Sequence, residues 1–165
     1  MNSSTPQANN SNQLQRIVAI SLIFVGILLV YFKTLDNPFF WDDSYLITDN
    51  HFIHDASNLK NIFNRSYFSQ PIEISYRPVT TLTFFADYAL WGAHTGGYHG
   101  VNLAIHFLNC LIVLALISRL TSPWTGAGAA LLFALHLVHT EAINMVTFRE
   151  DLLCLPFCGS ALLSY

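Results

Sequence analysis

One uncharged run, residues 17–32, most constrains this fold, and it reads IVAISLIFVGILLVYF. A helix needs roughly 20 apolar residues to cross the hydrocarbon core of a bilayer, or somewhat fewer where flanking side chains reach the interface. The run exceeds the ~7–15 apolar residues of a signal peptide, and the segment Lys33–Asp36 after it offers no small-residue cleavage site. We therefore predict a retained membrane helix over about residues 16–32, after a polar, uncharged lead-in at residues 1–15 that we expect to be disordered.

Three later segments approach the same length, and they cover about residues 98–117, 124–138 and 152–165. The second and third predicted spans are joined only by residues 118–123, so they are expected to form an antiparallel hairpin. The fourth reaches the end of the chain within an apolar run. The sequence therefore predicts an all-α membrane protein of which this chain is the N-terminal piece.

The composition excludes several classes of function. Only 10% of the residues are charged and 53% are hydrophobic, whereas an ordinary soluble domain has roughly 25% charged residues. The net charge is -3 with 7 Lys plus Arg, so the chain has no basic field for nucleic acid and we expect no nucleic-acid partner. Cys110, Cys154 and Cys158 all lie in apolar stretches and are expected to be buried thiols rather than disulfides.

Residues 33–97 form a loop between the first two predicted spans, and loops of that length are usually functional. We expect a short helix within residues 58–63, capped by Asp55 or Ser57, and a second helix over about residues 79–91 that lies along the membrane interface. The charges flanking the spans do not decide the orientation, although loops above ~60 residues translocate largely regardless of charge. The loop is rich in acidic residues, namely Asp36, Asp42, Asp43, Asp49, Asp55 and Glu73, with Asp87 near its end.

The adjacent carboxylates of Asp42 and Asp43 follow the first span in the sequence NPFFWDDSY, residues 37–45. Charge at a membrane surface is costly and often functional. Such a pair can take a proton from an incoming hydroxyl or hold a divalent cation against a phosphate. The alternative is a solvated pair that caps the helix after it.

A second polar segment, residues 135–151, follows the third predicted span and should emerge on the same membrane face as the acidic pair. It supplies Glu141 as a second acidic group, and His136 and His139 either as metal ligands with Glu141 or as hydrogen-bonded histidines at a helix end. The spacing matches no strong zinc motif, so no metal site is assigned and a divalent cation stays optional.

Two arginines are candidates for binding a phosphate. Arg77 precedes Pro78, which should start the second loop helix and hold Arg77 near the membrane. Arg149 stands beside Glu150 and Asp151. For Arg77 the alternative is a salt bridge to a loop carboxylate, and for Arg149 it is a local ion pair.

Polar side chains also recur within the second span. Asn102, His106 and Asn109 fall on one helix face, which should point into a bundle and hydrogen-bond other helices.

Together these motifs resemble the amino-terminal part of the transmembrane and tetratricopeptide-repeat containing O-mannosyltransferases and their bacterial relatives, members of the GT-C glycosyltransferase superfamily. The order and spacing match over about residues 37–153. The matching stretches are NPFFWDD (37–43), YRP (76–78), YHGVNLAIH (98–106), FALHLVHTEA (133–142) and residues 149–153.

The resemblance implies a GT-C-like polytopic helix bundle over residues 16–165, with residues 33–97 as a long first extracytoplasmic loop. It implies an integral, multi-pass protein of the bacterial inner membrane or the endoplasmic reticulum. The implied reaction moves a sugar, mannose by family, from a polyprenyl- or dolichyl-phosphate carrier to a Ser/Thr hydroxyl of an acceptor protein or to a glycan hydroxyl.

In that reaction the resemblance places the acidic pair on Asp42 and Asp43 and the second acidic residue on Glu141, while Arg77 or Arg149 would stabilise the phosphate leaving group. Residues 1–165 alone are expected to be inactive. Two alternatives stay open: a non-catalytic membrane protein whose loop binds a partner, and a transporter fragment in which Asn102, His106 and Asn109 line a polar path.

Overall fold

The computed structural model describes residues 6–69 and 75–165, and within them the regular elements are all helical. The chain divides into two units. The helix unit comprises Met1–Phe32, Leu103–His139 and Leu155–Tyr165, and the loop unit comprises Lys33–Asn102 and Thr140–Cys154. The predicted all-α class is therefore confirmed for the described part of the chain.

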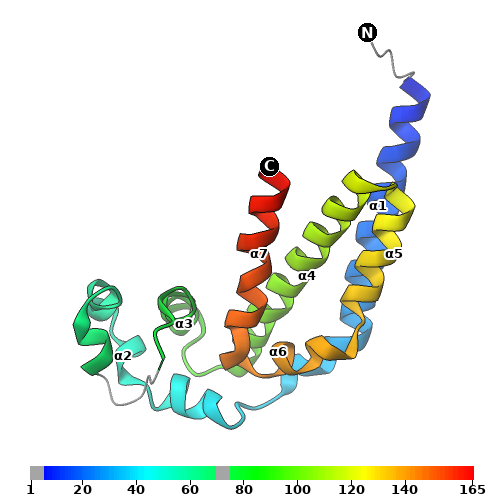
Figure 1. Cartoon of the computed structure of the whole chain (residues 1–165). Helices are drawn as coiled ribbons and strands as arrows, with labels where there is room; N and C mark the ends of the chain where they lie inside the picture. Colours follow the sequence, from blue (N-terminus) through cyan, green and yellow to red (C-terminus); the bar gives the residue numbers. More distant parts are fainter. Residues whose placement is uncertain (1–5, 70–74) are drawn as a thin grey trace. The chain divides into compact units, whose positions relative to one another are not determined.

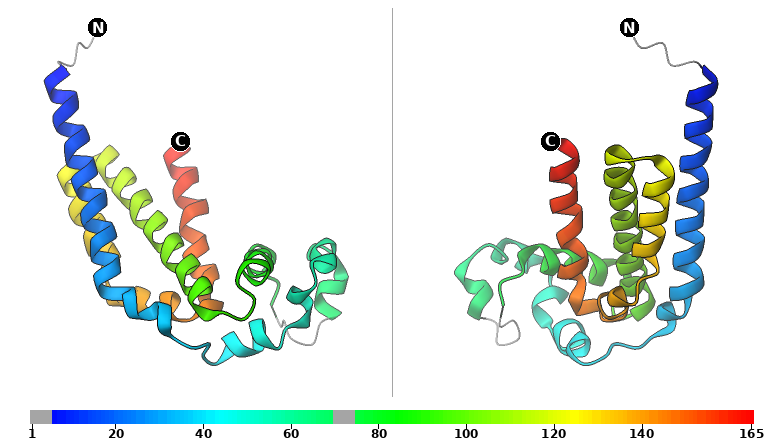
Figure 2. Two further views of the ribbon diagram at one scale, coloured as in Figure 1. Left: turned by 180° about the vertical axis from the view of Figure 1, so that it is seen from behind. Right: turned by 45° about the vertical axis from the view of Figure 1, so that its right-hand side comes forward.

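Four helices contribute residues to the helix unit, namely α1 (Pro6–Tyr31), α4 (Thr95–Leu120), α5 (Pro123–Ala134) and α7 (Arg149–Ser164). Helix α1 runs alongside α5 (Figures 1 and 2). Helices α4 and α7 begin in the loop unit and end in the helix unit.

Two described segments are long and apolar enough to cross a membrane, Gln13–Asp36 and Thr95–Leu120. A third candidate is obtained if the pair Pro123–Ala134 and Leu137–Asn144, bent by 47°, is counted as one segment. Helix α7 covers the fourth predicted span, but with 16 residues it is not among these candidates.

Two boundaries differ from the sequence prediction. Helix α1 already begins at Pro6, so residues 6–15 continue the helix instead of forming a disordered lead-in, and residues 1–5 lie outside the described part. An established helix extends at little cost, and Pro suits its first turn.

The third predicted span breaks at its end because α5 stops at Ala134. The carbonyl of Ala134 accepts a hydrogen bond from Nε2 of His106 at 3.1 Å. Nδ1 of His136 accepts the backbone N–H of Val138 at 3.2 Å, which starts the 3-10 helix η5 (Leu137–His139).

Close packing of α4 against α5 confirms the predicted hairpin. Ser122 caps α5 by accepting the N–H of Thr125 at 3.2 Å, and Pro123 follows it. Gly126 lies so near α4 that a Cβ there would stand 2.8 Å from the backbone nitrogen of Ser118 and 2.9 Å from the carbonyl oxygen of Leu114.

The loop unit is built from short elements and one longer helix. Its predicted interfacial helix is present as α3 (Pro78–Trp91), and the predicted short helix is a 3-10 helix, η3, whose first residues are capped when Asp55 accepts the N–H of Ser57 at 2.9 Å. The loop acid Glu73 lies outside the described residues. The short elements are η1 (Phe32–Asp36), the π-helix η2 (Ser44–Thr48), α2 (His51–His54), η3 (Ala56–Asn61), η4 (Arg65–Ser69), α6 (Thr140–Asn144) and η6 (Val146–Phe148).

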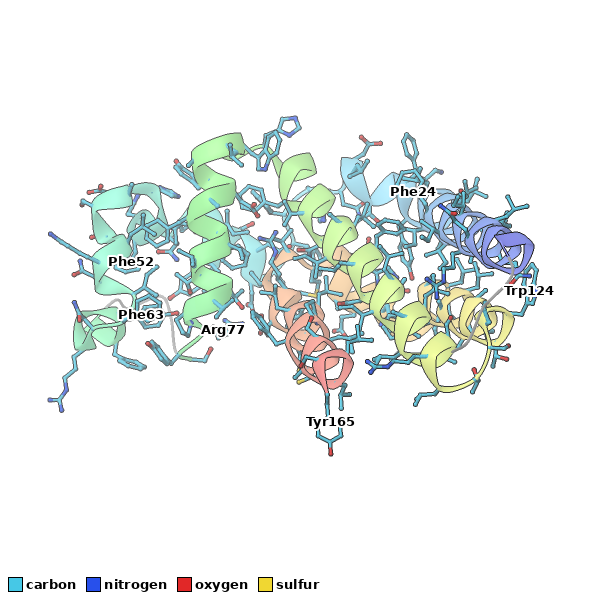
Figure 3. The ribbon with its side chains drawn as sticks, turned by 90° about the horizontal axis from the view of Figure 1, so that it is seen from above. Phe24, Phe52, Phe63, Arg77, Trp124 and Tyr165 are labelled. Carbon is cyan, nitrogen blue, oxygen red and sulfur yellow. The ribbon has the colours of Figure 1, made fainter. Side chains whose placement is uncertain are left out.

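An aromatic core holds the loop unit together. Phe52 belongs to α2 (His51–His54), is labelled in Figure 3, and meets the rings of Tyr67 and Phe85 edge to face. Aromatic pairs in this geometry stabilise a fold by about 0.5–1.5 kcal/mol each beyond their area burial. The buried members of the core are Ile47, Phe52, Ile53, Ile62, Tyr67, Phe84, Phe85, Tyr98 and Val146.

Candidate functional site

The candidate site starts at the turn that joins η1 to η2 in the loop unit. Asn144 fixes the beginning of this turn, because its Oδ1 accepts hydrogen bonds from Thr34 Oγ1 at 2.8 Å and from Asn37 Nδ2 at 3.0 Å. Trp41 has a φ of 53°, in the left-handed region, and the residue is 77% exposed. A non-glycine residue in this conformation is strained, and such strain often occurs at functional sites.

The two carboxylates of the acidic pair have different surroundings. Asp42 is exposed, whereas Asp43 is fully buried. Oδ1 of Asp43 accepts the backbone N–H of Thr147 at 2.8 Å and its hydroxyl at 2.9 Å, and Oδ2 accepts the N–H of Phe40 at 3.3 Å.

These contacts correct one interpretation and confirm another. The pair is not a solvated helix cap, because Asp43 is buried and makes no side-chain bond to the start of η2. The bond from Thr147 to Asp43 joins the acidic turn to the segment after the third span, so the predicted meeting of these two segments is confirmed.

Arg149, the first residue of α7, is fully buried. Its expected ion pair with Glu150 or Asp151 does not form; the partner is the buried carboxylate of Asp87 on α3. Neighbouring positions on a helix point in different directions, so Arg149 can face inward while the two acids beside it do not. Its hydrogen bonds go to Asn102 Oδ1 at 2.7 Å, Thr83 Oγ1 at 2.9 Å and Tyr98 O at 3.1 Å, and its guanidinium lies 5.0 Å from the Phe84 ring centroid.

The Arg149–Asp87 pair is an internal charge pair of the loop unit. Burial raises the pKa of Asp87 above its ordinary value, and the positive charge of Arg149 opposes that rise. Removing either partner would leave the other charge buried and unpaired, which is the costly case.

Arg77 is the more accessible of the two arginines. It directly precedes α3, at the end labelled in Figure 3, and pairs with Glu150, with side-chain exposures of 26% and 33%. Its Nη1 also lies 3.5 Å from the carbonyl oxygen of Thr147. Thr147 therefore contacts Asp43 through its N–H and hydroxyl and Arg77 through its carbonyl.

The five candidate residues thus fall into two groups. Asp43, Arg77 and Arg149 are bonded within the loop unit. Asp42 and Glu141 are exposed, and among the described residues neither side chain has a bonded partner.

A cavity of about 200 Å³ lies next to the acidic turn, lined by Asn37, Pro38, Phe40, Asn144 and Met145. One of these residues, Phe40, donates its backbone N–H to Asp43. It has room for several water molecules or a small polar group.

Within the described residues, no group of three His, Cys, Asp or Glu side chains could hold a metal ion. The ring centroids of His136 and His139 stand 6.3 Å apart in the helix unit, and the His139 ring lies tilted against that of Phe133 with 4.2 Å between centroids.

Sequence reasoning missed two residues that organise the site, Asp87 and Thr147. A signal for Asp87 existed: Thr80, Thr83 and Asp87 recur at helical spacing on α3, a largely apolar helix, which indicates a polar inner face. Thr147 carried no such signal, because its role depends on a partner far away in the sequence. The predicted packing role of Asn102 is confirmed, since it is buried and binds Arg149.

Comparison with known proteins finds relatives along most of the chain. A protein O-mannosyl-transferase of Caenorhabditis elegans is 34% identical over 152 residues, which cover 86% of this chain and 22% of that protein. The human protein O-mannosyl-transferase TMTC3 is 34% identical over 151 residues, covering 88% of this chain and 16% of the relative. The chain is a homologue of the TMTC protein O-mannosyl-transferases.

A third relative extends this homology to nearly the whole chain. Human TMTC1 is 31% identical over 170 residues, covering 98% of this chain and 19% of its own length. The chain thus spans about a fifth of the length of these three relatives. No family model and no solved structure matches it.

Proposed function

We propose that this chain supplies the first helices and the first extracytoplasmic loop of a multi-pass GT-C-type mannosyltransferase. The enzyme would move mannose from a polyprenyl- or dolichyl-phosphate carrier to a Ser/Thr hydroxyl of an acceptor protein or to another acceptor hydroxyl. The homology to proteins named O-mannosyl-transferases over most of the chain carries this proposal. The apolar helices, which suit a membrane-bound donor, support it.

Within the acidic pair, Asp42 is the better candidate for the general base. An acceptor hydroxyl is a weak nucleophile and reacts faster when a positioned carboxylate takes its proton. Asp42 is exposed and can reach such a hydroxyl, whereas Asp43 is buried and already engaged by Thr147 and Phe40. Asp43 is then a positioning residue that anchors the turn carrying Asp42.

Of the two arginines, Arg77 is the better candidate for the phosphate. Arg149 is fully buried and its guanidinium is engaged by Asp87 and three hydrogen-bond acceptors. Arg77 is partly exposed, and a phosphate could displace its present partner Glu150. Glu141 is exposed and is proposed as the second acid of the site, acting on the acceptor or on an optional divalent cation.

The transporter alternative receives no support. Asn102 and His106 are buried and bonded to groups within the protein, and Asn109 is 2% exposed. A polar path would need these side chains to meet water.

The decisive experiment compares carboxylate variants of the whole protein as its gene encodes it, supplied with a lipid-phosphate mannose donor at matched protein levels. Asp42→Asn should lose ~100- to 10,000-fold in transfer rate while its thermal unfolding stays unchanged. Asp43→Asn should lose both transfer and stability, because a buried acceptor of three hydrogen bonds is altered.

Asp49→Asn is the matched control, since Asp49 is an exposed aspartate in the same unit. It should keep the parent rate. Near-normal transfer by Asp42→Asn would remove this residue from the mechanism, and absence of any mannosyl transfer by the parent protein would favour the non-catalytic alternative.

A further inference from the structure

A larger cavity, of about 460 Å³, opens within the helix unit between α1, α4 and α7. Its lining residue Leu163 lies in the last turn of α7, next to Tyr165, which Figure 3 labels. Its lining residues are Arg16, Ile20, Leu111, Leu114, Ala115, Ser118, Arg119 and Leu163.

Two arginines give this cavity a positive mouth. Arg16 is exposed on α1, and Arg119 is exposed in the last turn of α4. Arg119 donates one hydrogen bond, from Nη1 to the carbonyl oxygen of Leu163, which leaves its other N–H groups to face a ligand. Among the described residues Arg16 has no bonded partner, and none of the eight lining residues is acidic.

Away from the arginines the walls are apolar. Ile20 lies one turn beyond Arg16 on α1, while Ala115 and Leu111 lie one and two turns before Arg119 on α4. Both helices belong to segments that can cross a membrane. A charged mouth at the helix ends, with an apolar wall deeper along the same helices, matches the form of a membrane lipid.

We propose that this cavity binds one anionic phospholipid, with its phosphate between Arg16 and Arg119 and an acyl chain along Ile20, Leu111 and Ala115. Guanidinium groups bind phosphate oxygens through paired, charge-assisted hydrogen bonds. A free phosphate would leave the apolar wall uncovered, and a zwitterionic lipid would bring a cation toward the two arginines. The site is separate from the loop-unit residues proposed for catalysis.

The test measures lipid retention by native mass spectrometry of the full chain, purified in detergent and mixed with phosphatidylglycerol or phosphatidylcholine. We expect phosphatidylglycerol to be retained and phosphatidylcholine to be released. The double variant Arg16→Gln/Arg119→Gln should retain at least about tenfold less phosphatidylglycerol, since two charged donors are lost.

Arg65→Gln is the matched charge control, because Arg65 is exposed in the loop unit and outside the cavity. It should retain lipid as the parent does. Ala115→Phe keeps both arginines but fills the apolar wall, and it should also reduce retention, which tests the site even if the double variant misfolds.

Three results would overturn the proposal. Equal retention of both lipids would mean an unspecific apolar surface, and full displacement by millimolar inorganic phosphate would mean a simple anion site. Unchanged phosphatidylglycerol retention in both the folded double variant and Ala115→Phe would place the lipid elsewhere.

Discussion

Arg149 and Asp87 place opposite charges inside the loop unit, and each depends on the other. Neither belongs to a surface ion pair, whose contribution to stability is typically ~0–1 kcal/mol. The hydrogen bonds that Arg149 donates to Asn102 and Thr83 connect α7, α4 and α3. This pair is therefore a structural centre of the unit that presents the acidic turn.

Arg149→Met is expected to destabilise the protein by about 3–5 kcal/mol, because it leaves the carboxylate of Asp87 buried without a partner. Chemical denaturation in a fixed detergent, followed by the fluorescence of the loop-unit aromatics, would measure the loss. The double variant Arg149→Met/Asp87→Leu should recover much of it. A double variant no more stable than the single one would show that the charge pair is not the cause.

The pH dependence of Arg149→Met follows from the pKa of Asp87. Burial already raises that pKa above the ordinary value of 3.8, and loss of Arg149 should raise it further. Well below the unfolded-state pKa of ~3.9, the carboxyl is neutral in both states and the deficit is smallest. As the pH rises, the unfolded state releases the proton while the folded state keeps it, so stability should fall until the folded-state pKa is passed. Unfolding midpoints between pH 4 and 8 would show this slope, which Asp87→Leu should abolish.

At the scale of elements, one glycine allows α5 to approach the backbone of α4 closely. Gly126 faces the α4 backbone at Ser118 and Leu114, whereas a Cβ on Gly128 would meet nothing within 4 Å. Gly126→Ala should weaken the hairpin and lower the thermal unfolding midpoint. Gly128→Ala should be neutral or stabilising by up to about 1 kcal/mol, since alanine favours helix more than glycine does. Equal effects of the two substitutions would mean that the helices do not pack closely at Gly126.

Elements with local signals were predictable from the sequence. The pattern over residues 79–91, with Pro78 before it, gives α3 (Pro78–Trp91), and the short connection at residues 118–123 gives the hairpin. No local pattern predicted the end of α5 at Ala134, whose carbonyl is bonded by His106 of another helix.

The candidate site was predictable only in part for the same reason. Because Asp42 and Asp43 are adjacent in the sequence, both were equally good candidates for the catalytic carboxylate. In the structure Asp42 is exposed, whereas Asp43 is buried against Thr147. The pairing of Arg149 with Asp87 likewise depends on how α3 and α7 pack, which no local pattern contains.

At the scale of the whole molecule, the sequence predicts that residues 33–97 and 139–151 lie on one side of the membrane and residues 118–123 on the other. Single cysteines at Ala56 and Thr121, both exposed, would test this after replacement of Cys110, Cys154 and Cys158. A membrane-impermeant maleimide should label the two positions from opposite faces. Labelling of both from the same face would contradict the three-crossing topology.

The conformation of Trp41 allows selection for stability to be distinguished from selection for function. Its left-handed φ of 53° costs an L-residue about 1–3 kcal/mol of stability. The residue is too exposed for burial of its indole to offset this cost. Selection for a stable chain alone would favour glycine at this position. Trp41→Gly should therefore unfold at a higher temperature than the parent, and any transfer activity that the more stable protein loses would measure what the indole does beyond folding.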